Sequence, residues 1–199
     1  MFNVVTSFNT MNKLVLKEVI KSIFPNMDEE PIEKITVHAT FLKYNKRTKL
    51  ISEGKSHHYF YFIVNGSVKS YYQKDLKEVC LWFAFENEVV STIKTFEGKP
   101  SNETIELLED SSLIQLKTKP IKELAKTDLS ISQWIMDLIT DHAIFLEERL
   151  YQLQFMNTQE RYKALINIAP EILQRVSLTD IASFLGVSRE TLSRIRAKK

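Results

Sequence analysis

The order of apolar and polar residues divides the chain into three stretches. Residues 1–35 predict helices, because apolar side chains recur at helical intervals before Pro25, at Leu14, Leu16, Val19, Ile20 and Ile23. From about Thr36 to Leu116 the pattern changes to short β runs separated by turn residues, at the spacing of a compact all-β unit. The expected strands are Thr40–Tyr44, Lys49–Ile51, Tyr59–Val64, Ser67–Tyr72, Glu78–Phe83, Thr104–Leu108 and Leu113–Lys117. The run at 59–64 is apolar on both faces, which predicts a strand covered from both sides.

From Pro120 onwards the pattern is helical again. One long helix is expected from about Leu129 to Met156, about seven turns and roughly 40 Å in length. Its apolar stripe, at steps of three or four, consists of Ile131, Ile135, Leu138, His142, Leu146, Leu150 and Leu153. We expect this stripe to pair with a second copy of the chain; packing on its own β unit is the alternative. Asn157, followed by Glu160, predicts the start of a new helix near 158–168.

The last 23 residues, SLTDIASFLGVSRETLSRIRAKK, predict a helix-turn-helix. Ser177 or Thr179 can cap the first helix, and Gly186 allows the left-handed turn that follows it. Val187 fills the angle between the helices, and Ser188 caps the second. The apolar positions expected to pack the two helices together are Ile181, Ala182, Leu185, Leu192 and Ile195. The alternative is an ordinary helical hairpin.

Charge is unevenly distributed along the 199 residues, although the net charge is only +2. From Val187 to Lys199 there are five basic side chains and one acidic side chain, a local net charge of +4 that leaves −2 on the rest. A basic tip on a mildly acidic body is expected of a protein that contacts nucleic acid, and a solubilising tail is the alternative.

Residues at the start of the second helix would enter the major groove of duplex DNA. Arg189 offers a fork for the two acceptors of guanine, Glu190 can accept from a cytosine amino group, and Arg194 can reach a further base or a phosphate. The other polar side chains could hold phosphates or add attraction that does not depend on sequence. The full set of predicted DNA contacts is Ser188, Arg189, Glu190, Thr191, Ser193, Arg194, Arg196 and Lys198, with Lys199 adding charge.

These residues carry a family resemblance. SRETLSR at 188–194 resembles the recognition helix of the Crp–Fnr (catabolite activator) family of bacterial transcription regulators, and LISEGKSHHYFYFIVNGSVK at 50–69 is similar to the signature of its β-roll. The predicted helix at 129–156 stands where the family has its dimer helix. The resemblance implies a homodimer that binds a two-fold DNA site. The chain ends after the second helix, where many relatives add a small β wing, so we expect a wing that is absent or reduced.

Cyclic-nucleotide-binding relatives hold the ribose with a glycine-glutamate pair and the phosphate with an arginine-serine pair. Alignment on Phe96 places Ser91 and Thr92 at the first pair and residues 99–103 at the second, and no arginine occurs between Arg47 and Arg149. A lysine there would act only as a point charge. The candidate effector pocket is Ser91, Thr92, Lys99, Ser101 and Asn102, and we expect an effector other than cyclic AMP.

Other chemistries lack the residues they need. The single cysteine, Cys80, excludes an iron–sulfur cluster and, in an apolar strand pattern, predicts a buried thiol. His57 and His58 would point to opposite faces of a strand, so no metal site is expected. The sequence contains no serine elbow and no phosphate loop that would indicate an enzyme. No membrane span or secretory signal is visible, and together with the lone cysteine this predicts a cytoplasmic protein without a bound cofactor.

The sequence therefore predicts an α+β protein in three parts. Residues 1–128 would form N-terminal helices and a cyclic-nucleotide-binding-type β-roll (jelly roll) that senses an unidentified effector. Residues 129–156 would form the dimerisation helix, and residues 157–199 a winged-helix-like DNA-binding unit. The expected function is transcription regulation as a homodimer on double-stranded DNA, with RNA polymerase as a further partner if the protein activates transcription. The alternative is a cyclic-nucleotide-type sensor that acts through protein partners.

Overall fold

The computed structural model describes residues 14, 17–18, 20–21, 27–75 and 77–197. The predicted helical positions Leu16, Val19 and Ile23 and the predicted phosphate contact Lys198 lie outside the described residues. The strands are β1 (Ala39–Tyr44), β2 (Lys49–Ile51), β3 (Tyr59–Asn65), β4 (Val68–Lys74), β5 (Lys77–Ala84), β6 (Val89–Val90), β7 (Thr104–Leu107) and β8 (Ser111–Lys117). The helices are α2 (Glu29–Thr36), α3 (Ile93–Glu97), α4 (Thr118–Ala125), α5 (Leu129–Phe155), α6 (Thr158–Ile168), α7 (Ile172–Arg175), α8 (Leu178–Leu185) and α9 (Arg189–Ala197).

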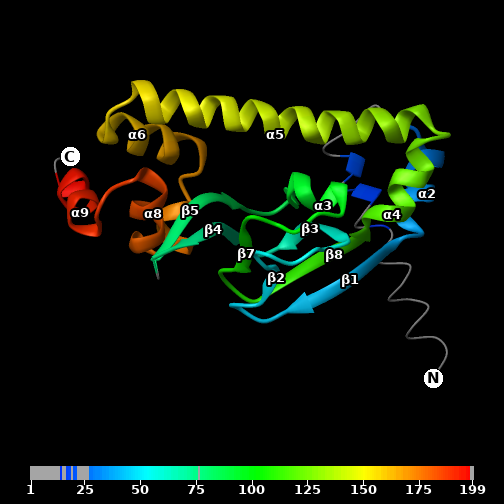
Figure 1. The fold of residues 1–199 in the computed structure, drawn as a ribbon, viewed down its shortest axis with the longest axis horizontal. Helices are drawn as coiled ribbons and strands as arrows, with labels where there is room; N and C mark the ends of the chain where they lie inside the picture. Colours follow the sequence, from blue (N-terminus) through cyan, green and yellow to red (C-terminus); the bar gives the residue numbers. More distant parts are fainter. Residues whose placement is uncertain (1–13, 15–16, 19, 22–26, 76, 198–199) are drawn as a thin grey trace.

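The strands form two four-stranded antiparallel sheets packed as a roll (Figure 1). The strand order is β1-β8-β3-β6 in the first sheet and β2-β7-β4-β5 in the second. All seven predicted strands are present. The space between the sheets is filled by ten buried side chains: Leu50, Ile51, Tyr61, Ile63, Val68, Ala84, Val90, Ile105, Leu107 and Leu113.

Strand β3 has both faces buried, as its continuous apolar sequence predicts. Tyr61 and Ile63 face the second sheet, whereas Phe60 and Phe62 face the helices that cover the first sheet. Trp134 of α5 stacks on Phe62, with ring centroids 6.2 Å apart and an interplanar angle of 9°. Buried residues of α2, α4 and α5 complete this layer, so the roll and the start of α5 share one core.

The sequence pattern does not predict two short elements, β6 and α3. Strand β6 has only two residues, too few for an alternating pattern. Helix α3 has five residues; Thr92 caps its start, and Gly98 ends it in the left-handed conformation at a φ of 72°. The sequence predicted only a turn at Gly98–Pro100, because a single helical turn is too short to show a 3.6-residue period.

Helix α5 runs along one side of the molecule, from α4 at one end to α6 at the other (Figure 1). Its predicted apolar stripe requires a correction. Ile131 is completely buried against the roll, and Ile135 and Leu138 pack against the same core. The first half of the stripe is therefore used within the chain, whereas Leu146, Leu150 and Leu153 remain exposed.

The C-terminal helices α6 to α9 pack around a third buried cluster, which includes Tyr162, Ile172, Ile181 and Leu192. Asn157 caps the start of α6 as predicted, and Glu160 completes a capping box with it. Residues 170–176 contain the short helix α7. Among the described residues no helix is long and apolar enough to cross a membrane, and no group of histidine, cysteine and carboxylate side chains could hold a metal ion.

Candidate nucleic-acid interface and effector pocket

Helices α8 and α9 meet through a three-residue turn whose geometry follows from its sequence. Ser177 caps α8 by accepting a hydrogen bond from the backbone N–H of Asp180 (3.1 Å). Gly186 adopts the left-handed conformation at a φ of 71°, and the backbone N–H of Val187 donates to the carbonyl of Ala182 (3.0 Å). Ser188 caps α9 through the backbone N–H of Thr191 (3.2 Å). The two helices are thus held at a fixed angle.

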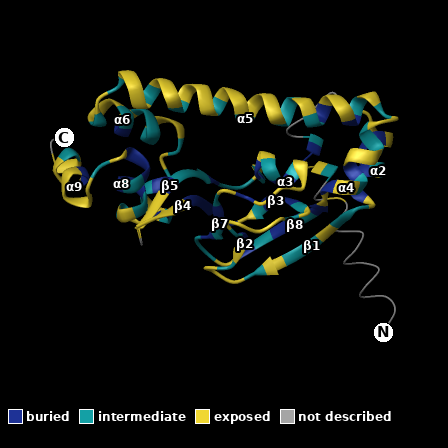
Figure 2. Ribbon diagram, viewed as in Figure 1, coloured by how far each residue is buried: buried dark blue, intermediate teal, exposed yellow. Residues whose placement is uncertain are grey.

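Helix α9 has one buried face and one exposed polar face. Leu192 is fully buried and Ile195 packs on the same cluster, so these two side chains fix the helix on α8. The predicted contact residues within the described part are all exposed, as Figure 2 shows for this end of the molecule: Ser188, Arg189, Glu190, Thr191, Ser193, Arg194 and Arg196. Hydrogen bonds from its own backbone N–H and from Ser188 lower the pKa of Glu190, which keeps this carboxylate an acceptor.

The exposed arginines of α9 have no carboxylate partner that would hold them on the protein. Arg189, Arg194 and Arg196 form no salt bridge within the described residues, whereas Arg175 and Lys69, elsewhere in the chain, do. Free guanidinium groups on one exposed helix face are available to phosphates and base edges.

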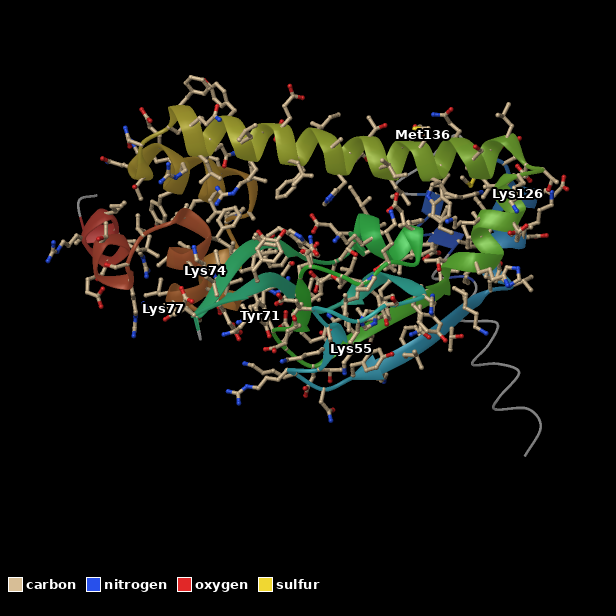
Figure 3. The ribbon with its side chains drawn as sticks, in the orientation of Figure 1. Lys55, Tyr71, Lys74, Lys77, Lys126 and Met136 are labelled. Atoms are coloured by element: carbon tan, nitrogen blue, oxygen red, sulfur yellow. The ribbon has the colours of Figure 1, made fainter. Side chains whose placement is uncertain are left out.

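Helix α5 presents an exposed stripe that differs from the predicted one. Its members alternate at steps of four and three residues, and each is exposed: Ser132, Met136, Ile139, Ala143, Leu146, Leu150 and Leu153. Met136 lies on the side of α5 that faces away from the sheets (Figure 3). A small or apolar residue at alternating steps of four and three is the pattern by which two helices pack along a common seam. We call this set the α5 stripe.

The five predicted effector residues are distributed over three cavities. Lys99, Ser101 and Asn102 border an open hollow of about 680 Å³ beside Glu53 and Lys94. Thr92 lines a second cavity of about 460 Å³, which Asn102 also borders, and Ser91 lines a third of about 640 Å³.

Most of the polar groups at these five positions are already used within the protein. Lys99 pairs with Glu97 (2.7 Å), and Asn102 accepts from Lys94 (2.6 Å). The Thr92 hydroxyl accepts from the backbone of Thr95 (3.1 Å), and the Ser101 hydroxyl donates to the carbonyl of Glu103 (2.8 Å). These side chains therefore serve first to shape the turn around α3.

Glu103 is a pocket residue outside the five predicted positions. Its carboxylate accepts hydrogen bonds from the Trp82 indole (3.0 Å) and from the Ser70 hydroxyl, and it lines the 460 Å³ cavity. Burial raises its pKa. The signal was present in the sequence, because Glu103 is the acidic residue in the segment where cyclic-nucleotide-binding relatives have their arginine.

The roll is similar to a known protein family. Residues 41–128 match the cyclic nucleotide-binding domain family. A sequence search of curated proteins finds no match. Among solved structures, FixK2 from Bradyrhizobium japonicum superposes with a TM-score of 0.69 at 22% identity, over 80% of this chain and 83% of that one.

Two further solved structures resemble different extents of the chain. CLP, a c-di-GMP-responsive global regulator from Xanthomonas campestris, gives a TM-score of 0.65 at 20% identity, over 86% of this chain and 91% of its own. The sensor domain of the transcriptional regulator DNR from Pseudomonas aeruginosa gives a TM-score of 0.57 at 16% identity, over 73% of this chain and 97% of its own. At these identities the likeness shows the fold alone, a β-roll followed by a long helix.

Proposed function

We propose that this protein is a homodimeric, DNA-binding transcription regulator. Helix α9 carries the proposal, because Leu192 and Ile195 fix it on α8 while Arg189, Glu190 and Arg194 stand exposed. A helix held in this way can enter the major groove with its first turns. The likeness to CLP and DNR, which are named as regulators, supports the same reading.

The α5 stripe supports a two-fold assembly. Two copies that pack along this stripe would bury side chains such as Met136, Ile139 and Leu150, which are otherwise exposed to water. Leu146 and Leu153, at the edge of the stripe, also border the 460 Å³ cavity. Each copy would then present one helix α9, which lies at the end of the molecule remote from α2 and α4 (Figure 1). A symmetric protein of this kind reads a two-fold DNA site, with half-sites about one helical turn apart.

Cyclic AMP is not the expected effector of the cyclic nucleotide-binding domain. Ser91 and Thr92 stand at the ribose-binding pair, and the arginine that would neutralise a phosphate is absent. Glu103 adds a carboxylate that faces the cavity, and a second negative group would be repelled there unless this carboxylate is protonated. Isothermal titration calorimetry with cyclic AMP should show no saturable heat; a micromolar dissociation constant would contradict this part of the proposal.

The DNA-binding proposal is tested by selecting duplexes from a random pool and measuring affinity for the winning sequence by fluorescence anisotropy. Arg189→Ala should cost about 1–3 kcal/mol on the selected duplex and relax the base preference at one position of each half-site. Arg47→Ala, the control, removes an exposed arginine from the loop between β1 and β2 and should change neither the affinity for the duplex nor the base preference. Equal losses on selected and random duplexes would contradict the base-reading role of Arg189.

Phosphate contacts have a separate signature. Arg196→Ala should weaken binding to all duplexes alike and reduce the slope of log affinity against log salt by about one. The same change is expected for Lys198→Ala. If no duplex is enriched and random DNA is not bound, the DNA-binding function is rejected, and a sensor that acts through protein partners becomes the better explanation.

A further inference from the structure

The 460 Å³ cavity lies between the roll and the C-terminal helices. Strand β5, helix α3, helix α5 and helix α8 all contribute to its wall. Apolar and aromatic side chains form most of the lining: Val79, Leu81, Trp82, Phe145, Leu146 and Phe184. The volume is within the range of small-molecule sites, which are typically about 300–1,000 Å³ and mainly apolar with a few polar anchors.

Arg149 is the polar anchor at the α8 side of this cavity. Its guanidinium lies 3.8 Å from the centroid of the Phe184 ring, and its Nη2 donates to the Phe184 carbonyl. Its Nη1 is buried and has no hydrogen-bond partner in the described part of the chain, where Arg149 also forms no salt bridge. No ion pair with a carboxylate of the described residues balances the charge of Arg149 at the cavity wall, and an anion bound in the cavity would balance it.

A second arginine increases the positive potential at this place. Arg161 of α6 donates to the Leu185 carbonyl (3.1 Å), so two guanidinium groups hold the last two carbonyls of α8. The Nε of Arg161 is likewise buried without a partner among the described residues. Burial, together with the charge of Arg161, lowers the pKa of Arg149 to about 10, so Arg149 stays charged at neutral pH.

The other charged groups that line the cavity make the α3 side less favourable for an anion than Arg149. Lys94 donates to Asn102 at that side, but Glu103, hydrogen-bonded to Trp82, lines the same side and would repel a negative group there. His142 also lines the cavity, and burial lowers its pKa, which favours the neutral imidazole. An anionic group would therefore bind at Arg149, with an apolar body lying along Trp82 and Phe145.

We propose that this cavity binds a small monocarboxylate with an apolar body, whose carboxylate is held by Arg149. The chemical class includes medium-chain fatty acids and aryl carboxylates. Because Arg149 also holds the carbonyl of Phe184, a ligand at this arginine would act directly on α8 and, through the Gly186 turn, on α9. This regulatory consequence rests on the proposed DNA-binding function, whereas the binding itself does not.

The test uses the full chain and two fluorescent probes of matched shape. These are 8-anilinonaphthalene-1-sulfonate, which is anionic, and N-phenyl-1-naphthylamine, which is neutral. The wild-type protein should bind the anionic probe at one saturable site, and decanoate should displace it at least about tenfold more effectively than decanol. Equal displacement by the acid and the alcohol, or no saturable binding of the anionic probe, would overturn the proposal.

Variants locate the site. Arg149→Met should weaken the anionic probe about tenfold or more and leave the neutral probe within about twofold. Arg149→Lys should restore part of the affinity for the anion, because it restores the charge. Lys163→Met, which removes an exposed charge from α6 outside the cavity, is the matched control and should bind both probes normally. Unchanged binding of the anionic probe by Arg149→Met would reject Arg149 as the anchor.

The wild-type displacement experiment does not depend on how well any variant folds. Probe binding and duplex binding are measured separately, so the two proposals can fail independently. A protein that binds its selected duplex but does not bind the anionic probe rejects the ligand site alone. A protein that binds the probe but no duplex keeps the ligand site and rejects the function proposed above.

Discussion

Arg175 of α7 forms a bidentate ion pair with Glu86, in which Nη1 lies 2.7 Å from Oε2 and Nη2 lies 2.8 Å from Oε1. The same guanidinium contacts Glu109 (2.6 Å) and lies 5.0 Å from the ring centroid of Phe85. Glu86 and Glu109 follow strands β5 and β7 of the roll. One arginine of α7 therefore bridges two loops of the roll, and this contact ties the C-terminal helices to the roll.

Removal of this arginine should loosen the C-terminal helices. The pair is partly buried, with about a fifth of the Arg175 side chain exposed, so its loss should cost more than that of a surface pair. We expect Arg175→Met to lower the free energy of unfolding by about 1–3 kcal/mol, measured by urea denaturation. Lys77→Met, which removes an exposed charge from β5, should change it by less than about 0.5 kcal/mol. Equal effects of the two substitutions would contradict a structural role for the ion pair.

The same contact predicts a pH dependence. The Arg175 guanidinium, together with the backbone N–H of Gly66, lowers the pKa of Glu86 from 4.5 to about 2. A carboxyl whose pKa is lower in the folded state contributes stability above its unfolded pKa and loses it as the pH falls. The urea midpoint of the wild type should therefore decrease between about pH 4.5 and pH 2. In Arg175→Met this decrease should be smaller, and an identical decrease in both proteins would show that other carboxyls cause it.

Cys80 should be a slowly reacting thiol. It is 4% exposed on β5, and its backbone N–H donates to the Ser183 hydroxyl of α8 (2.9 Å). Burial raises its pKa well above the ordinary value, so little thiolate forms near neutral pH. Reaction with 5,5′-dithiobis(2-nitrobenzoic acid) at pH 8 should be at least about a hundredfold slower in the native protein than in urea. A fast native reaction would indicate that the thiol is accessible and that β5 separates readily from α8.

The roll was predictable because its sequence pattern is local. Strand β3 shows this, since an apolar run covered on both faces reads directly as a strand between two layers. The caps of α6, α8 and α9 were also predictable, because Asn157, Ser177 and Ser188 act on the first turn that follows each of them.

The pocket and the helix stripe were less predictable, because both depend on contacts between distant segments. The carboxylate of Glu103 is placed in the pocket by Trp82 and Ser70, which are 21 and 33 residues away in sequence. The α5 sequence is apolar on more than one side. Only the position of the roll decides that Ile131 faces inward while Ile139 faces water.

Two isoleucines of α5 allow the dimer to be tested with one kind of substitution. Ile139 belongs to the α5 stripe, whereas Ile144 lies about 140° away around the helix at 3.6 residues per turn. Both are exposed, 39% and 48% respectively, so a glutamate at either position disturbs the folded monomer little. Ile139→Glu would place two like charges in the seam, and we expect it to convert the dimer to a monomer at micromolar concentration, as measured by light scattering after size-exclusion chromatography. Ile144→Glu should remain a dimer. If both variants stay dimeric, the seam lies elsewhere. If the wild type is itself a monomer at micromolar concentration, the two-fold assembly is rejected, because the exposed side chains of the stripe would then have no partner copy.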